Sequence, residues 1–232
     1  MNKKAVIILS GGLDSTTCMG IAKDQGYDLF PITFDYGQRH NIEIEKSKQV
    51  ANYYGVRDKQ KIIPLSFLKD FGGSALTDEN LEVPDVVKSD GSNDDSSDIP
   101  ITYVPGRNLL FLSIATSYAE VLKADAIFIG VNALDYSGYP DCRPEFIAKM
   151  EEVISIATKV GVEGQKVKIE TPLISWSKAE IIKEGLKIDV PYHLTTSCYN
   201  GEEEACGTCD SCRLRLKGFE EAGSKDPIPY SS

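Results

Sequence analysis

The sequence predicts an α/β fold, in which a parallel sheet carries helices on both faces, followed by a small cysteine-rich helical tail. Short apolar runs of strand length alternate with longer segments of helical periodicity, which is the pattern of a parallel sheet with crossover helices. Four cysteines then gather between residues 198 and 212. We expect an ATP-binding α/β domain over residues 1–190 and a metal-binding C-terminal subdomain over residues 191–232.

The composition is that of a globular protein, with 232 residues, of which 41% are hydrophobic and 26% charged. A net charge of −10 would repel phosphate backbones, so we expect no nucleic-acid partner. No stretch approaches the roughly 18 apolar residues of a membrane span, and the N-terminal apolar run is too short for a signal peptide. We therefore expect a cytoplasmic protein without membrane contact, whose thiols stay reduced.

A glycine-rich loop separates the first predicted strand, residues 5–9, from the first predicted helix, residues 13–23. The loop is Ser10-Gly11-Gly12-Leu13-Asp14-Ser15. Glycines let the backbone approach an anion, and the free N–H groups at a helix start donate to phosphate oxygens. Neither the lysine of G-x-x-x-x-G-K-[ST] nor the pattern G-x-G-x-x-G is present. The sequence therefore predicts a phosphate site that is neither a P-loop nor a dinucleotide site.

This loop resembles the PP-loop of ATP pyrophosphatases, which cleave ATP between its α- and β-phosphates and adenylate a substrate. The resemblance predicts that the following residues bind ATP: Ile8, Leu9, Ser10, Gly11, Gly12, Leu13, Asp14, Ser15, Thr16, Thr17 and Cys18. Asp35, after the second predicted strand, lies where such folds meet a ribose, although a turn-forming aspartate is the alternative. Cys18 is also expected to be a buried apolar side chain. A serine-rich turn without a ligand is the alternative for the whole loop.

Hydrophobic periodicity and capping residues predict the remaining elements. Strands are expected over residues 28–34, 61–65, 126–131 and 167–173, and helices over residues 41–54, 109–123, 144–160 and 177–184. Helix 109–123 is apolar nearly all round and should be central. Ser177 and Glu180 form a capping-box pattern, while Gly55 and Gly185 should end their helices. Residues 70–100 are rich in Gly, Ser and Asp, which predicts a mobile excursion over the site or a solvated insertion.

Two further polar stretches belong to the candidate site. Arg107 and Asn108 stand at the start of helix 109–123, where a guanidinium can clamp a phosphate or a carboxylate. The loop over residues 132–144 adds two carboxylates, two tyrosines and an arginine: Asp135, Tyr136, Tyr139, Asp141 and Arg143. Tyrosines can stack on a planar ring, and carboxylates can accept a guanine-type pair of N–H groups. A packed tyrosine-rich loop is the alternative. Lys178 either meets a phosphate or is solvated.

Cys198, Cys206, Cys209 and Cys212 give the strongest signal near the end of the chain. Four thiolates at this spacing form a closed tetrahedral zinc site, which stabilises a fold and leaves no position for a substrate. An iron–sulfur cluster is the alternative, because Cys-x2-Cys-x2-Cys also opens a ferredoxin-type run. Cys142 lies in the polar loop, so its thiol is either reactive or structural.

Taken together and in this order, these motifs closely resemble the QueC family of 7-cyano-7-deazaguanine synthases in queuosine biosynthesis. The resemblance runs from about residue 4 to residue 219, and the tyrosine-rich loop combined with the cysteine tail is its most specific part. It implies a Rossmann-like sheet of the adenine nucleotide alpha hydrolase type. It also implies a carbon–nitrogen ligase, which converts 7-carboxy-7-deazaguanine, ammonia and ATP into the 7-cyano compound through an adenylate and an amide.

The resemblance further implies residue roles and partners. Ser10, Asp14, Ser15 and Lys178 would act in catalysis, with Mg²⁺ between Asp14 and the pyrophosphate. The four cysteines would hold one structural Zn²⁺ per chain, and the protein would be a homodimer. The substrate would contact Arg107, Asn108, Asp135, Tyr136, Tyr139, Asp141 and Arg143. Two rival functions stay open: a PP-loop tRNA-modifying enzyme that thiolates or ligates a base, and a nucleotide-sensing or zinc-ribbon interaction protein without turnover.

Overall fold

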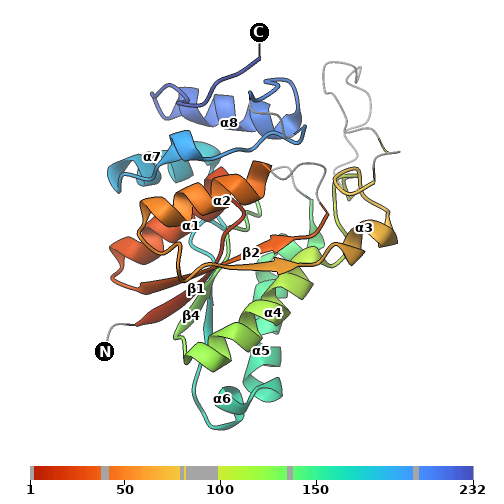
Figure 1. Ribbon diagram of the computed structural model, residues 1–232, viewed down its shortest axis with the longest axis vertical. Helices are drawn as coiled ribbons and strands as arrows, with labels where there is room; N and C mark the ends of the chain where they lie inside the picture. Colours follow the sequence, from red (N-terminus) through yellow and green to blue (C-terminus); the bar gives the residue numbers. More distant parts are fainter. Residues whose placement is uncertain are drawn as a thin grey trace.

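The computed structural model describes residues 3–37, 42–78, 81, 99–134, 138–200 and 204–231. Within them, five parallel strands form one sheet in the order β3-β2-β1-β4-β5 (Figure 1). The strands are β1 (Lys4–Ile8), β2 (Asp28–Asp35), β3 (Lys61–Pro64), β4 (Ala126–Phe128) and β5 (Lys168–Glu170). The chain winds outward from β1 to β3 and then returns to β4 beside β1, which confirms the predicted Rossmann-like fold. Sheets of this kind bind ligands at the point of reversal.

Helices cover both faces of the sheet (Figure 1). In β1, Ala5 and Ile7 belong to the core on one face and Val6 and Ile8 to the core on the other, because side chains alternate along a strand. The first core is shared with α1, α2, α7 and α8, and the second with α3, α4, α5 and α6. The helices are α1 (Leu13–Asp24), α2 (Ile42–Tyr53), α3 (Phe67–Phe71), α4 (Arg107–Leu122), α5 (Pro144–Ala157), α6 (Lys159–Val162), α7 (Lys178–Lys187) and α8 (Asp210–Glu221). No helix in these described ranges is long and apolar enough to cross a bilayer.

The predicted elements all exist, but several expectations about them are wrong. Helix α4 begins at Arg107 and is not central, because Leu109 and Val121 are 48% and 81% exposed. The helix predicted over residues 144–160 breaks at Thr158, whose hydroxyl accepts a hydrogen bond from the Gly161 N–H at 3.1 Å and begins α6. Strands β4 and β5 are shorter than predicted, ending at Phe128 and Glu170, and the chain after β5 turns at residues 172–175.

Gly185 does not end its helix, contrary to the prediction. The capping box at the start of α7 is confirmed, because Ser177 Oγ accepts from the Glu180 N–H and Glu180 accepts from the Ser177 N–H. The helix then continues through Gly185 to Lys187. A side chain at position 185 would collide with the hydroxyl and ring of Tyr192. Glycine stands here because two segments pack closely, which no local pattern reveals.

The cysteine-rich C-terminal region packs on the sheet domain through α8. Phe219 lies in the core that α7 shares, and its ring meets the ring of Tyr192 edge-on with 5.5 Å between centres. A smaller core of its own surrounds the cysteines and includes Tyr199, Ile228 and Tyr230. The domain boundary near residue 190 stays a prediction. Most of the insertion predicted over residues 70–100 lies outside the described residues.

Candidate active site

A cavity of about 430 Å³ opens at the carboxyl ends of β1 and β4, where the sheet reverses. The glycine-rich loop and the start of α1 form one wall. Residues 196–199 and the first turns of α8 form another, and the end of β2, the start of α2 and the start of α4 contribute a third. The cavity therefore joins the predicted phosphate loop to the start of α4 and to the cysteine-rich region.

The glycine-rich loop is held by short hydrogen bonds. The hydroxyl oxygens of Ser10 and Ser15 lie 2.9 Å apart, and Ser15 also donates to the Gly12 carbonyl at 3.1 Å. Gly11 has a φ of +86°, and a Cβ there would lie 2.5 Å from the carbonyl oxygen of Glu43, so glycine alone lets α2 pack on the loop. Gly12 begins α1 without a side-chain cap among the described residues, so the first N–H groups of the helix can receive a phosphate.

The structure brings part of the predicted ATP site to the cavity wall: Ile8, Ser10, Gly12, Leu13, Asp14 and Ser15. Leu9 and Cys18 lie in the core, as expected for Cys18, and burial raises the pKa of its thiol. The Thr17 hydroxyl is buried, donates to the Leu13 carbonyl and lies 2.9 Å from the Tyr192 hydroxyl. Other predicted ATP-binding residues do not line the cavity: Gly11, Thr16 and Asp35.

Asp14 and Lys178 form an ion pair across two helices. Lys178 Nζ lies 2.8 and 2.9 Å from the two carboxylate oxygens of Asp14, and the side chains are 13% and 28% exposed. Both residues line the cavity. The sequence predicted that Asp14 lies beside phosphate and that Lys178 either meets a phosphate or is solvated, and it gave no sign that the two residues pair. The lysine gives Asp14 a counter-charge within the chain, in the place where the sequence suggested Mg²⁺.

Tyr36 and Arg107 form a part of the cavity that suits a planar anion. Arg107 Nη1 donates to the Tyr36 hydroxyl at 3.4 Å, and the guanidinium lies 5.6 Å from the centre of the Tyr36 ring. Burial raises the pKa of Tyr36 to about 12, so the phenol stays neutral. Burial opposes the charge of Arg107, but nearby Tyr36 and Tyr139 raise the pKa of Arg107 overall. Phe111 lies 5.6 Å from Tyr36, centre to centre. A fixed cation thus stands among aromatic rings.

Asp141, Asn108 and Cys142 support the start of α4. Asp141 Oδ2 accepts from the Asn108 N–H at 2.9 Å, while Asn108 Nδ2 donates to the Asp141 carbonyl and to the Cys142 sulfur at 3.3 and 3.4 Å. Asn108, Cys142 and Tyr139 line the cavity, and Asp141 does not. Arg143 is exposed at the start of α5. Two predicted substrate residues lie outside the described part of the chain: Asp135 and Tyr136.

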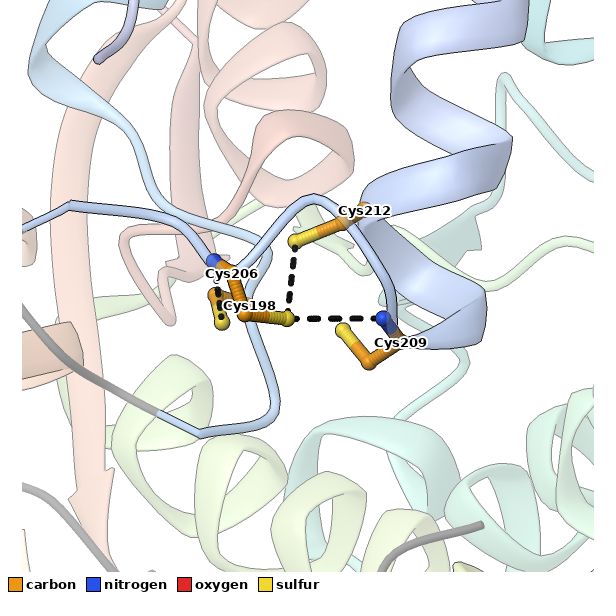
Figure 2. Close-up of side chains that lie close together, drawn as sticks. All are labelled: Cys198, Cys206, Cys209 and Cys212. Atoms are coloured by element: carbon orange, nitrogen blue, oxygen red, sulfur yellow. Dashed lines mark hydrogen bonds between the residues drawn. The ribbon is translucent and has the colours of Figure 1, made fainter. Parts of the chain in front are cut away.

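The four cysteines converge, with Cys212 coming from the first turn of α8 (Figure 2). Their sulfur atoms all lie within 4.8 Å of one another. Thiolates at about 2.3 Å from one zinc ion would be about 3.8 Å apart, and the sulfurs of Cys206 and Cys212 are 3.9 Å apart. The cluster therefore has the ligands and spacing to hold a metal such as zinc.

Some cavity residues were missed from the sequence. The Thr196 N–H donates to the Gly11 carbonyl at 3.1 Å, and Ser197 and Tyr199 line the same wall on either side of Cys198. Their position beside a metal-ligand cysteine was the only local signal. Glu43, on the first turn of α2, also lines the cavity, and no pattern marked it.

Fold and site together define an α/β protein of the PP-loop class, with a cavity beside its glycine-rich loop. A 4-thiouridine synthetase, solved as an RNA complex with bound ATP, has the same fold, with a TM-score of 0.51 at 19% identity. That match covers 96% of this chain and 54% of the synthetase, so this chain spans about half of its length.

Sequence relatives identify the particular family. The chain belongs to the QueC family of queuosine biosynthesis proteins, whose model matches residues 4–223. The 7-cyano-7-deazaguanine synthase of Oceanobacillus iheyensis is 59% identical over 228 residues, covering 98% of each chain. The synthase of Acetivibrio thermocellus is 56% identical, also over 98% of each chain. The predicted family is confirmed, the chain is an enzyme, and the tRNA-modifying alternative is not favoured.

Proposed function

We propose that this chain is a carbon–nitrogen ligase that converts 7-carboxy-7-deazaguanine, ammonia and ATP into 7-cyano-7-deazaguanine. One observation carries the proposal: a single cavity joins the glycine-rich loop to the cationic, aromatic part around Tyr36 and Arg107. The former suits phosphates, and the latter suits a planar ring that bears a carboxylate. The names of the synthases that match nearly the full chain support it.

The chemistry needs an activated oxygen twice. The substrate carboxylate attacks the α-phosphorus of ATP and pyrophosphate leaves. Ammonia then displaces AMP and gives the amide with loss of a proton. The amide oxygen attacks the α-phosphorus of a second ATP, and pyrophosphate leaves again. Elimination of AMP, with loss of both N–H protons over the two steps, gives the nitrile. Because both activations are attacks by an oxygen on the same phosphorus position, one loop serves both through positioning and charge stabilisation.

The residue roles follow from position in the cavity. Ser10, Gly12 and Ser15, with the N–H groups that begin α1, hold the phosphates. Lys178 neutralises charge that develops on the leaving pyrophosphate, and Asp14 holds the side-chain ammonium group of Lys178 in place. Arg107 takes the substrate carboxylate, and the tyrosines contact the ring: Tyr36 and Tyr139. Mg²⁺ would accompany the ATP phosphates, and Asp14, while paired with Lys178, would be the carboxylate that faces it.

The remaining partners are proposed on the same basis. The four cysteines hold one structural zinc ion, which supplies folding energy and no catalytic step. The protein acts in the cytoplasm as a homodimer, without a nucleic-acid or membrane partner. The apolar side chains exposed on the outer helices offer surface for such a dimer: Leu109, Val121, Val153, Ile156 and Val162.

Product analysis tests the function directly. The protein is incubated with 7-carboxy-7-deazaguanine, ATP, Mg²⁺ and ammonium, and mass spectrometry follows the amide and the nitrile while AMP and pyrophosphate are quantified. We expect the amide first and then the nitrile, with pyrophosphate formed at each activation. If neither amide nor nitrile forms, the proposal is wrong. ATP binding without AMP formation would indicate an interaction protein instead.

A further inference from the structure

Three carboxylate-bearing residues among the described residues line the cavity: Asp14, Glu43 and Asp210. Asp14 is paired with Lys178. Asp210 is exposed at the start of α8, directly after Cys209 in the cysteine-rich wall. Glu43 is half-buried and accepts no hydrogen bond from the described part of the chain. Among the described residues it is therefore the carboxylate still available to a ligand in the part of the cavity near Arg107.

The backbone of Glu43 is fixed against the glycine-rich loop. A Cβ at Gly11 would lie 2.5 Å from the Glu43 carbonyl oxygen and 2.6 Å from the Ser47 nitrogen. The Ser47 hydroxyl donates to the Ile44 carbonyl at 2.7 Å and receives a hydrogen bond from Gln60 Nε2 at 3.1 Å. The first turn of α2 is thus locked between the loop and the edge of the sheet. This places the carboxylate at a set distance from the phosphate site.

The surroundings of Glu43 are aromatic and cationic. The charge of Arg107 acts on the Glu43 carboxyl group, and the Glu43 carboxylate in turn raises the pKa of Tyr36. Both Tyr36 and Arg107 line the same cavity as Glu43. Burial raises the pKa of Glu43, and the positive charge of Arg107 partly offsets that effect. A carboxylate that is partly desolvated gains most from a ligand that donates two hydrogen bonds to it.

We propose that Glu43 is the residue that recognises the guanine-type edge of the substrate, by accepting hydrogen bonds from the ring N1–H and the 2-amino group. This inference rests on the proposed function. A guanine-type ring presents these two donors side by side, and an ionised carboxylate presents two acceptors at matching spacing. Glu43 and Arg107 then hold opposite ends of one ring, the first by its donors and the second by its carboxylate.

Glu43 replaces the two carboxylates that the sequence suggested for this task. Asp141 is committed elsewhere, because its Oδ2 accepts from the Asn108 N–H and its side chain does not line the cavity. Asp135 lies outside the described residues and is therefore the rival reader in the test.

The test compares two substrates in matched variants. One is 7-carboxy-7-deazaguanine, and the other is the same compound without its 2-amino group. The variants are Glu43→Gln, Asp135→Asn and the control Glu45→Gln, which alters an exposed residue of the same helix turn that pairs with Lys48. We expect the wild type to prefer the amino compound by roughly 10–100-fold in kcat/KM, as expected for a hydrogen bond to a charged group. Glu43→Gln should show nearly equal kcat/KM for the two compounds, whereas Glu45→Gln should keep the wild-type preference.

Each outcome decides the proposal. If Glu43→Gln keeps the preference, or if Asp135→Asn alone abolishes it, the assignment to Glu43 is overturned. Thermal melts of all variants establish that they are folded, and Glu43→Ala serves as a second variant that should lose the preference as well. If the wild type makes no amide or nitrile, the proposed function fails. Calorimetric titration with the two compounds then decides the role of Glu43 separately, because it needs binding and not turnover.

Discussion

At the scale of single residues, the Asp14–Lys178 pair lies in the cavity beside the loop proposed to bind the phosphates of ATP. Lys178→Ala would leave the Asp14 carboxylate without its counter-charge near the phosphates, so we expect kcat/KM for ATP to fall roughly 10–100-fold. The measurement is the steady-state rate of pyrophosphate release as ATP is varied. Lys183→Ala, which removes an exposed lysine from the same helix, is the matched control. Equal kcat/KM for ATP in the two variants would show that Lys178 does not contribute to the binding or reaction of ATP.

Gly11 makes a second residue-scale prediction, because two penalties meet at this position. Gly11→Ala would place a Cβ at a φ of +86° and 2.5 Å from the Glu43 carbonyl oxygen. Gly26→Ala shares the first penalty, with a φ of +81°, but its Cβ would have open space. We expect a loss of about 1 kcal/mol in the free energy of unfolding for Gly26→Ala and about 3 kcal/mol or more for Gly11→Ala. Urea denaturation measures both, and equal losses would mean that α2 moves away freely.

The pKa of Glu43 predicts how stability depends on pH. Burial raises this pKa above its ordinary value of 4.5. The folded state then binds the proton more tightly than the unfolded state, so the free energy of unfolding falls as pH rises from about 4.5 through the raised value. Glu43→Gln removes this loss. Its stability relative to the wild type should therefore increase with pH across that window and level off above it. Urea denaturation from about pH 4 to about pH 8 measures the difference, and a constant difference would contradict the prediction.

At the scale of elements, α8 and the tail after it hold the cavity wall through Arg215. Its guanidinium is bound by both carboxylate oxygens of Asp226, at 2.7 and 3.0 Å, and these side chains are 1% and 3% exposed. Arg215 also donates to the hydroxyls of Thr195 and Ser197, at 2.8 and 3.3 Å. Thr196, between them, donates to the Gly11 carbonyl. The tail is thereby connected to the glycine-rich loop.

Asp226→Asn tests this connection. The substitution leaves a buried guanidinium without its full counter-charge, which we expect to lower the free energy of unfolding by about 3 kcal/mol. Below the melting range, KM for ATP should rise more than kcat falls, because the wall beside the loop loosens while the reacting groups remain. Glu221→Gln removes an exposed pair with Lys217 at 3.7 Å and should change stability by less than about 0.5 kcal/mol. If KM for ATP is unchanged in Asp226→Asn, Arg215 stabilises the fold but does not support the cavity wall.

Elements with local signals could be predicted from the sequence, and contacts between distant segments could not. The capping box at Ser177 and the loop from Ser10 to Ser15 depend on neighbours a few residues away, so their positions were correct. Gly185 was misjudged because its neighbour is Tyr192, across a turn. The pairing of Asp14 with Lys178 spans 164 residues, and nothing in either segment encodes it. The family resemblance gave the reaction, but the residues that contact ligands depend on packing.

At the scale of the whole molecule, the cysteine cluster joins protein stability to the shape of the cavity. Cys198 follows Ser197 directly, and both line the cavity together with Tyr199 and the start of α8. Cys209 directly precedes that helix and Cys212 lies in its first turn. The metal proposed for the four sulfurs would therefore hold one wall of the proposed ATP site in place without touching ATP.

Removing the metal should accordingly affect stability and ATP binding together. We expect one zinc per chain by elemental analysis and a colourless protein, whereas a brown protein would indicate an iron–sulfur cluster. Chelation, or the variant Cys209→Ser, should lower the melting temperature by more than about 10 °C, because metal binding contributes folding energy directly. Calorimetric titration of the chelated protein below its melting temperature should show weakened ATP affinity, and added Zn²⁺ should restore it. If ATP affinity survived while the melting temperature fell, residues 196–199 would keep their place without the metal, and the hydrogen bond from Thr196 to Gly11 would suffice to hold the wall.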